Sequence, residues 1–144
     1  MVLPDIVSPS QGAFIKGRDI VGNILICQDL IKLYKRRSCS PRAMMKIDLQ
    51  KAYDSVEWEF VGHMLEALGF PEKICRLVMQ CITTPSYSLS LNGESFGFFR
   101  GRRGLRQGDP LSPLLFTVCL EYLSRVLMVV QKHSRFKFHP SARG

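Results

Sequence analysis

The sequence predicts an α+β fold in which helices pack on a small, incomplete antiparallel sheet. Apolar residues recur at helical spacing in several segments, and an Asn92-Gly93 pair separates two segments that alternate between apolar and polar residues. The 144 residues are 46% hydrophobic and 22% charged, which suits one globular domain with a modest core. We therefore expect a single domain over residues 1–144 with the element order α-β-α-α-β-β-α.

The first third of the chain predicts a helix, a loop and a strand. Apolar side chains lie at helical spacing in residues 19–34, and Asp19 is available to cap this helix. Residues 35–42 are basic, contain a proline and predict a loop. Residues 43–49 (AMMKIDL) form a short apolar run that ends in an acid. We expect a buried strand there, although periodicity alone does not exclude a helix.

Two consecutive helices are predicted in the middle of the chain. The first begins at Asp54, because Glu57 follows three residues later in a capping-box pattern. Gly69 is a natural C-terminal stop for this helix. Pro71 then occupies the position where the first turn of the next helix is expected.

A hairpin and a long helix complete the predicted fold. Residues 86–99 alternate, turn at Asn92-Gly93 and predict a β-hairpin. The long apolar segment that follows predicts a helix that starts at Asp109-Pro110 or at Ser112-Pro113. Residues 132–144 are basic, and we expect them to form a frayed tail.

Composition narrows the classes of partner. Twenty Lys and Arg against twelve Asp and Glu give a formal charge of +8, which favours nucleic acid first and an anionic membrane second. The sequence has no uninterrupted run of eighteen apolar residues and no secretory signal, so we expect no membrane partner and an intracellular location. Five widely spaced cysteines argue against a zinc site and predict reduced, mostly buried thiols.

Asp48 and Asp54 are predicted to have different roles. Asp48 ends the predicted strand, where its side chain can point into a cleft, whereas Asp54 opens the predicted helix as a structural cap. An aspartate at the end of a strand is more often a turn or cap residue than a metal ligand. Mg²⁺ is usually held by one or two carboxylates together with substrate phosphates, so Asp48 alone does not complete a site.

Three motifs, at residues 11–31, 46–58 and 104–116, jointly resemble a known family. They read QGAFIKGRDIVGNILICQDLI, KIDLQKAYDSVEW and GLRQGDPLSPLLF. In this order they are similar to the reverse transcriptase domain of non-LTR, LINE-type retrotransposons of the plant kind, over roughly residues 11–130. The resemblance implies a partial polymerase right-hand fold with a piece of the fingers and palm. It also implies two Mg²⁺ ions, an RNA template, a DNA primer, a dNTP substrate and a nuclear location.

The resemblance assigns catalytic roles near the second motif. Asp48 is similar to the first metal-binding aspartate of the family, and the Leu49 backbone carbonyl is a possible additional ligand. Tyr53 lies where reverse transcriptases place an aromatic gate under the incoming sugar. Without the family, simple packing of Tyr53 under the following helix has similar weight.

Further assignments concern the nucleotide and the nucleic acid. Gln107 and Gly108 resemble the loop that lies against the incoming nucleotide and template base, although a turn that caps the long helix is compatible with the same residues. Arg18 resembles the fingers arginine near the triphosphate. An arginine-rich run is predicted to bind template and primer, with solvated surface charge as the alternative. It consists of Arg100, Arg102, Arg103 and Arg106.

The match departs from the family after the third motif. Asp109 is the last aspartate of the 144 residues, so they contain no aromatic-x-Asp-Asp motif. Without that hairpin, the predicted strand 43–49 lacks its neighbours and should be exposed. Two hypotheses follow. The chain is a fragment of an RNA-directed DNA polymerase that is inactive in isolation, or it is a non-catalytic basic remnant that binds nucleic acid.

Overall fold

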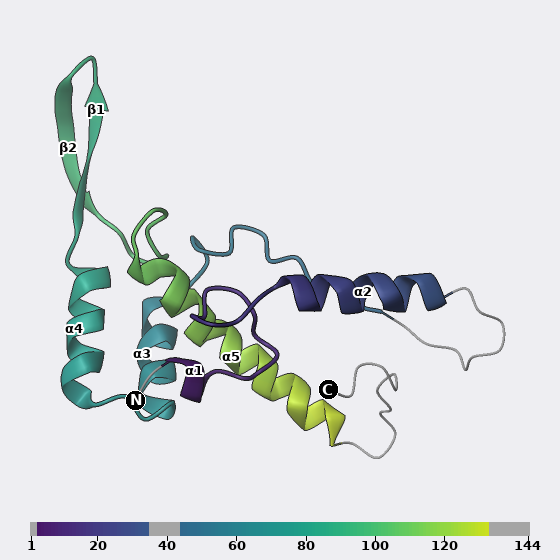
Figure 1. The fold of residues 1–144 in the computed structure, drawn as a ribbon. Helices are drawn as coiled ribbons and strands as arrows, with labels where there is room; N and C mark the ends of the chain where they lie inside the picture. The colour runs from purple at the N-terminus through teal and green to yellow at the C-terminus, as the bar shows by residue number, and fades with distance from the viewer. Residues whose placement is uncertain (1–2, 35–43, 133–144) are drawn as a thin grey trace.

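A computed structural model of the protein describes residues 3–34 and 44–132. Within these residues it confirms the α+β class and adds a short helix at the N-terminus (Figure 1). The elements are α1 (Leu3–Ile6), α2 (Val21–Leu33), α3 (Trp58–Ala67), α4 (Glu72–Thr83), β1 (Ser86–Leu91), β2 (Glu94–Arg100) and α5 (Leu111–Gln131). The predicted loop 35–42 and, apart from Lys132, the predicted tail lie outside the described residues.

The core lies between helices. Helix α3 packs against both α4 and α5, and its apolar residues at helical spacing face these two neighbours. Val61 and Leu65 of α3 and Val118 of α5 are almost fully buried. The cluster consists of Val56, Val61, Met64, Leu65, Leu68, Cys75, Leu105, Leu115 and Val118.

The sheet is the hairpin of β1 and β2, and it projects from the helices (Figure 1). Asn92 and Gly93 both have positive φ, 52° and 85°, as the two-residue turn requires. The strands pair with each other only, among the described elements, and most of their side chains are exposed. The predicted small antiparallel sheet is therefore present, and the helices pack mainly on one another.

The predicted strand at residues 43–49 is wrong for the residues that the structure describes. Residues 44–49 have no regular secondary structure, and all of them are exposed. A strand needs a neighbour to satisfy its backbone groups, and no described strand pairs with this segment. The expectation that this segment is exposed is confirmed.

The predicted cap at Asp54 is also wrong. Helix α3 begins at Trp58 with Glu57 as its N-cap residue, and Asp54 lies in a turn four residues upstream. The reason is tertiary. In a helix capped by Asp54 the carbonyl of Val56 would accept from the N–H group of residue 60, but it accepts instead from the Gly104 N–H group (2.7 Å).

Other predicted helix ends are confirmed. Gly69 ends α3 with φ of 76°, and its N–H group donates to the carbonyl of Glu66. Pro71 precedes α4 directly. Helices α2 and α5 are each capped by an aspartate two residues before their first residue. Asp19 accepts a hydrogen bond from the Val21 N–H group (3.0 Å), and Asp109 accepts one from the Leu111 N–H group (2.8 Å).

Helix α5 is long and apolar enough, by length and composition, to cross a membrane. The core helix of a soluble domain meets the same criterion. Thr117 and Glu121 of this helix are buried polar residues, and Glu121 forms an ion pair with Arg125 at 3.0 Å. These contacts place the first half of α5 in the domain core.

The described cysteines are less buried than predicted. Cys75 is buried and Cys119 is half-buried, but Cys27 and Cys81 are exposed. Burial raises the pKa of Cys119 from 9.0 to about 11. The expectation of mostly buried thiols is therefore wrong for Cys27 and Cys81.

Candidate functional site

An open groove of about 420 Å³ separates the segment after residue 47 from helices α3 and α5. Its wall is largely apolar, with Phe60 from α3 and Phe116 from α5, and two acids, Asp48 and Glu57, also line it. The remaining lining residues are Leu49, Gln50, Ala52, Ser55, Val56, Cys119, Leu120, Tyr122 and Leu123. The groove therefore places the exposed Asp48 carboxylate beside an apolar surface.

The described residues do not by themselves fit a centre for two divalent ions. Asp48 and Leu49 both line the groove, and their role as metal ligands stays a prediction. Residues 3–34 and 44–132 contain no group of three or more His, Cys, Asp or Glu side chains that could hold a metal ion. Glu57, the other acid of the groove, is paired with Arg103 at 3.3 Å. One available carboxylate is too few for two hydrated cations.

Tyr53 is held in a half-buried position beside this groove. Its ring lies 5.1 Å from that of Phe116, with the two planes inclined at 31°. Phe116 of α5 is thus one packing partner of Tyr53, which also packs against the core cluster that includes residues of α3. Because Phe116 also lines the groove, it connects Tyr53 to the surface that carries Asp48. The role of Tyr53 as a gate for the sugar stays a prediction.

The loop 104–109 is attached at one end to residues 46–58, called here the Asp48 segment, and at the other end to α5. Gly104 has φ of 90°, and a Cβ added there would lie 3.2 Å from the Asp54 Cα atom. The Trp58 indole N–H group donates to the Gly104 carbonyl at 2.7 Å. At the other end, Asp109 caps α5. The loop is therefore fastened at both ends.

Gln107 and Gly108 are displayed at the exposed tip of this loop. Gly108 has φ of 87°, and a Cβ added there would meet nothing within 4 Å. The predicted turn that caps the helix is present, and it also leaves the Gln107 side chain exposed. Gln107 and Gly108 are not among the residues that line the groove with Asp48. The structure thus joins the loop to the Asp48 segment through the backbone, without placing its tip in that groove.

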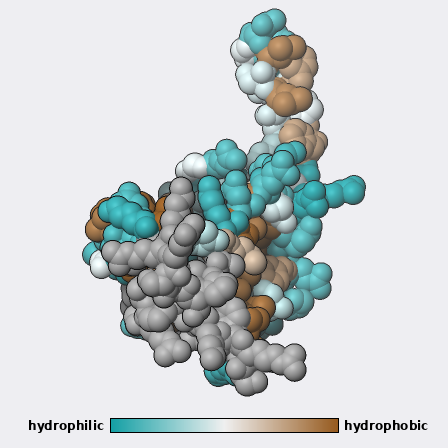
Figure 2. Space-filling model, turned by 90° about the vertical axis from the view of Figure 1, so that its right-hand side faces the viewer, coloured by the Kyte–Doolittle hydropathy of each residue, from teal (hydrophilic) through white to brown (hydrophobic). Residues whose placement is uncertain are grey.

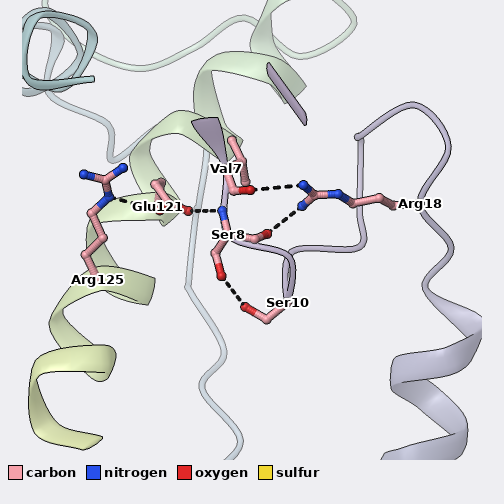
Figure 3. Close-up of polar contacts among 6 residues, drawn as sticks. All are labelled: Val7, Ser8, Ser10, Arg18, Glu121 and Arg125. Carbon is pink, nitrogen blue, oxygen red and sulfur yellow. Dashed lines mark hydrogen bonds and ion pairs between the residues drawn. The ribbon is translucent and has the colours of Figure 1, made fainter. Parts of the chain in front are cut away.

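Arg18 contacts backbone near the N-terminus. Its guanidinium donates to the carbonyls of Val7 (3.0 Å), Ser8 (2.5 Å) and Gln11 (3.0 Å). Figure 3 shows Arg18 on one side of the Val7-Ser8 backbone and Glu121 on the other. These contacts give Arg18 a structural task, because they consume donors that a triphosphate would need. Its contact with phosphate stays a prediction.

Comparison with known families completes these observations. The family model described as Reverse transcriptase (RNA-dependent DNA polymerase) matches residues 2–136. The chain belongs to the reverse transcriptase family. Members of this family generally use divalent metals and bind a nucleic-acid template and primer.

Relatives of this reverse transcriptase domain are retrotransposon proteins. The chain is 30% identical over 119 residues to the Pol polyprotein of the type-2 retrotransposable element R2DM of Drosophila melanogaster, covering 83% of this chain and 11% of the relative. It is 27% identical over 120 residues to an uncharacterized 149 kDa protein of transposon TX1 of Xenopus laevis, covering 83% and 9%. It is 49% identical over 45 residues to a mitochondrial protein of Arabidopsis thaliana, covering 31% and 37%. The predicted kinship with non-LTR retrotransposon reverse transcriptases is confirmed, and the chain spans about a tenth of those two retrotransposon proteins.

The four arginines predicted to bind template and primer are all exposed in this reverse transcriptase domain. Arg103 pairs with Glu57, and the Arg106 guanidinium lies 5.5 Å from the centre of the Tyr87 ring. Arg100 ends β2 and Arg102 follows two residues later. Arg103 and Arg106 thus contact other side chains and remain exposed to solvent.

One buried polar contact was not predicted from the sequence. Glu121 is 3% exposed, and its carboxylate accepts from the Ser8 N–H group (2.8 Å) and from Arg125 (3.0 Å) (Figure 3). A signal was available, because Glu121 is the only acid in the apolar stretch 111–131, and Arg125 follows four residues later. The pairing with Ser8 spans 113 residues, and no local pattern predicts it.

Proposed function

We propose that this chain is part of an RNA-directed DNA polymerase, with Asp48 as one carboxylate of its divalent-metal site. The observation that carries the proposal is the attachment of the Asp48 segment to the loop of Gln107 and Gly108. Backbone hydrogen bonds from Gly104 to Val56 (2.7 Å) and from Leu105 to Tyr53 (2.9 Å) hold the two motifs side by side. Family membership supports the class of reaction, and the hydrogen bonds support a common site for the two motifs.

Asp48 suits the metal role chemically. Its exposed carboxylate is a hard oxygen ligand of the kind that Mg²⁺ prefers, and it lies at an open groove that a substrate can enter. We propose that the remaining carboxylates come from an aromatic-x-Asp-Asp segment, a motif that the 144 residues do not contain. The described residues alone do not provide enough carboxylates for both ions.

We propose supporting roles for the neighbouring residues. The RNA template, DNA primer and dNTP would meet at the loop tip, where Gln107 offers an uncharged amide and Gly108 allows close approach of the backbone. Tyr53 would act as the sugar gate from its position against Phe116. Arg18 would act through the backbone of residues 7–11, since its donors already contact carbonyls there.

The test uses a polypeptide that carries this chain together with an aromatic-x-Asp-Asp segment. Asp48→Asn removes the charge of the ligand without changing its size, so we expect primer extension to fall at least about a hundredfold while template affinity is retained. Asp54→Asn is the matched control, because Asp54 lies in an exposed turn and does not line the groove. Equal activity of Asp48→Asn and Asp54→Asn would refute the metal role of Asp48.

The isolated 144-residue chain provides a second test. We expect no primer extension on an RNA template with Mg²⁺ or Mn²⁺, because one carboxylate does not hold two ions. Extension that disappears on Asp48→Ala would contradict this expectation.

The exposed arginines favour a second candidate function, that of a non-catalytic nucleic-acid-binding remnant. This candidate predicts binding that weakens steeply as salt rises, because each phosphate contact releases counterions. Fluorescence anisotropy with a labelled RNA at several salt concentrations measures the slope. Binding that is absent or independent of salt would exclude this function.

A further inference from the structure

The projecting hairpin carries an apolar face that is largely exposed to solvent. Side chains directly opposite each other in the two strands share a face, and so do alternate residues along each strand. The register pairs Tyr87 with Phe99 and Leu89 with Phe96 on one face, while Ser86 pairs with Arg100 on the other. Four apolar side chains therefore share one face, while the face of Ser86 and Arg100 is polar at the base of the hairpin.

Exposure is high along the hairpin except at Tyr87, which is half-buried near its base. Leu89 is 66% exposed and Phe99 is 52% exposed, and Phe98, beside the β-bulge, reaches 81%. Figure 2 shows the hairpin as a projection on which hydrophobic residues lie open to solvent beside polar ones. An exposed ribbon of this composition marks an interaction surface.

Two aromatic rings of the hairpin, Tyr87 and Phe99, form a row that leads to the loop of Gln107. The Arg106 guanidinium lies 5.5 Å from the centre of the Tyr87 ring, and the Tyr87 ring lies 5.8 Å from that of Phe99, inclined at 30°. Cation, first ring and second ring thus follow one another from the loop into the hairpin. A ligand with several planar groups that extends from the loop towards the hairpin can therefore contact the Tyr87 and Phe99 rings in turn.

Charge at the base of the arm selects the kind of partner. Residues 86–108 contain four arginines and a single acid, Glu94, which lies beside the turn at the far end. The positive charge therefore gathers at the base, next to the aromatic row. A partner with both a polyanionic backbone and stackable planar groups complements this combination.

We propose that the β1–β2 hairpin is a stacking arm for single-stranded nucleic acid. Bases stack on the aromatic side chains of the hairpin while phosphates contact Arg100 and Arg102 at its base. The inference extends the proposed function, because it names the surface that holds the strand beyond the nucleotide loop. It is tested by binding alone, so a failure of primer extension and a failure of stacking are separate observations.

The experiment measures binding of the 144-residue chain to three fluorescein-labelled oligonucleotides by anisotropy. They are a single-stranded 16-mer of thymidines, an abasic strand with the same number of phosphates, and a blunt duplex. The double variant Phe96→Leu/Phe98→Leu keeps apolar bulk and removes two rings. We expect its affinity for the thymidine strand to fall on the order of tenfold, with little change for the abasic strand or the duplex.

Two control variants separate stacking from charge. Tyr34→Leu removes an aromatic ring that is 52% exposed at the end of α2, and it should leave all three affinities unchanged. Arg100→Gln/Arg102→Gln should weaken the thymidine and abasic strands alike and lower the salt slope by about 1.4, or 0.7 for each lost phosphate contact. The fluorescence of Trp58, the only tryptophan, reports whether each variant is folded.

Three results would overturn the proposal. The first is an unchanged affinity of the folded Phe96→Leu/Phe98→Leu variant for the thymidine strand. The second is an equal loss for the abasic strand, which would make the arm a charge contact only. The third is a concentration-dependent dimer, seen by sedimentation, that dissociates in the same variant and would assign the apolar face to a second copy of the chain.

Discussion

The helical core and the hairpin arm contain similar apolar residues in opposite surroundings. Leu65 of α3 is 1% exposed, whereas Leu89 of β1 is 66% exposed. The face of α3 meets α4 and α5, while most of the apolar face of the hairpin is exposed to solvent. Periodicity therefore reveals which face of an element is apolar, but the partner that covers it decides whether that face stabilises the domain or binds something else.

Truncation of one leucine in each region should show the largest difference. Leu65→Ala removes fully buried methyl groups and leaves a cavity, so we expect the free energy of unfolding to fall by about 2–5 kcal/mol. Leu89→Ala should change it by less than about 0.5 kcal/mol. Urea unfolding measures both variants. Equal losses would mean that the hairpin is buried in solution.

Alanine substitution of two glycines in the 104–109 loop compares a backbone position in close contact, Gly104, with one in open space, Gly108. Gly104 and Gly108 have nearly the same φ, 90° and 87°, so alanine should cost about 1–2 kcal/mol of backbone strain at either position. Gly104→Ala also places a methyl group 3.2 Å from the Asp54 Cα atom, and we expect a further loss of about 1 kcal/mol or more. Thermal unfolding of both variants makes the comparison. A smaller loss for Gly104→Ala would contradict the close approach.

Removal of the buried carboxylate of α5 tests how the N-terminal segment is held. Glu121→Ala leaves the Ser8 N–H group buried without its acceptor, so we expect a loss of about 1–3 kcal/mol in the free energy of unfolding. Arg125→Gln removes the charge of the half-exposed partner but keeps a hydrogen-bond donor for the buried carboxylate, so it should cost less than Glu121→Ala. Chemical denaturation distinguishes the two. Equal effects would assign the stability to the ion pair instead of the Ser8 contact.

The smallest expected effect is a pH dependence from Cys119. Burial raises the pKa of this thiol to about 11, so the folded state holds the proton more tightly than the unfolded state. Its contribution to stability is fully present below about pH 9 and is lost as the pH rises towards 11. Because the side chain is only half-buried, we expect a loss below about 1 kcal/mol, seen as the difference between the wild type and Cys119→Val. No difference between them over this range would contradict the burial.

Much of the fold follows from local signals in the sequence. Gly69, Pro71 and the Asn92-Gly93 turn act within a few residues, and the elements that they bound are the ones that the structure contains. The family was also evident from sequence, because the three motifs keep their residue types and order and the family model matches residues 2–136. The roles of Asp48, Tyr53, Gln107 and Gly108 come from that resemblance and stay predictions.

Tertiary contacts decided what local patterns did not. The helix predicted from Asp54 begins at Trp58, because the backbone of residues 53–56 bonds to Gly104 and Leu105. The strand predicted at 43–49 is an exposed, irregular segment in its described part, since a strand forms only beside a partner. Arg18 contacts the backbone of residues 7–11, and Glu121 reaches Ser8 across 113 residues.

The sequence by itself determined which segments become helices or the hairpin and the family to which the chain belongs, because those signals are carried by neighbouring residues. Only the tertiary structure decided which apolar faces are covered and which polar groups meet. Those outcomes depend on contacts such as the one between Trp58 and Gly104, 46 residues apart, that form when the chain folds back on itself.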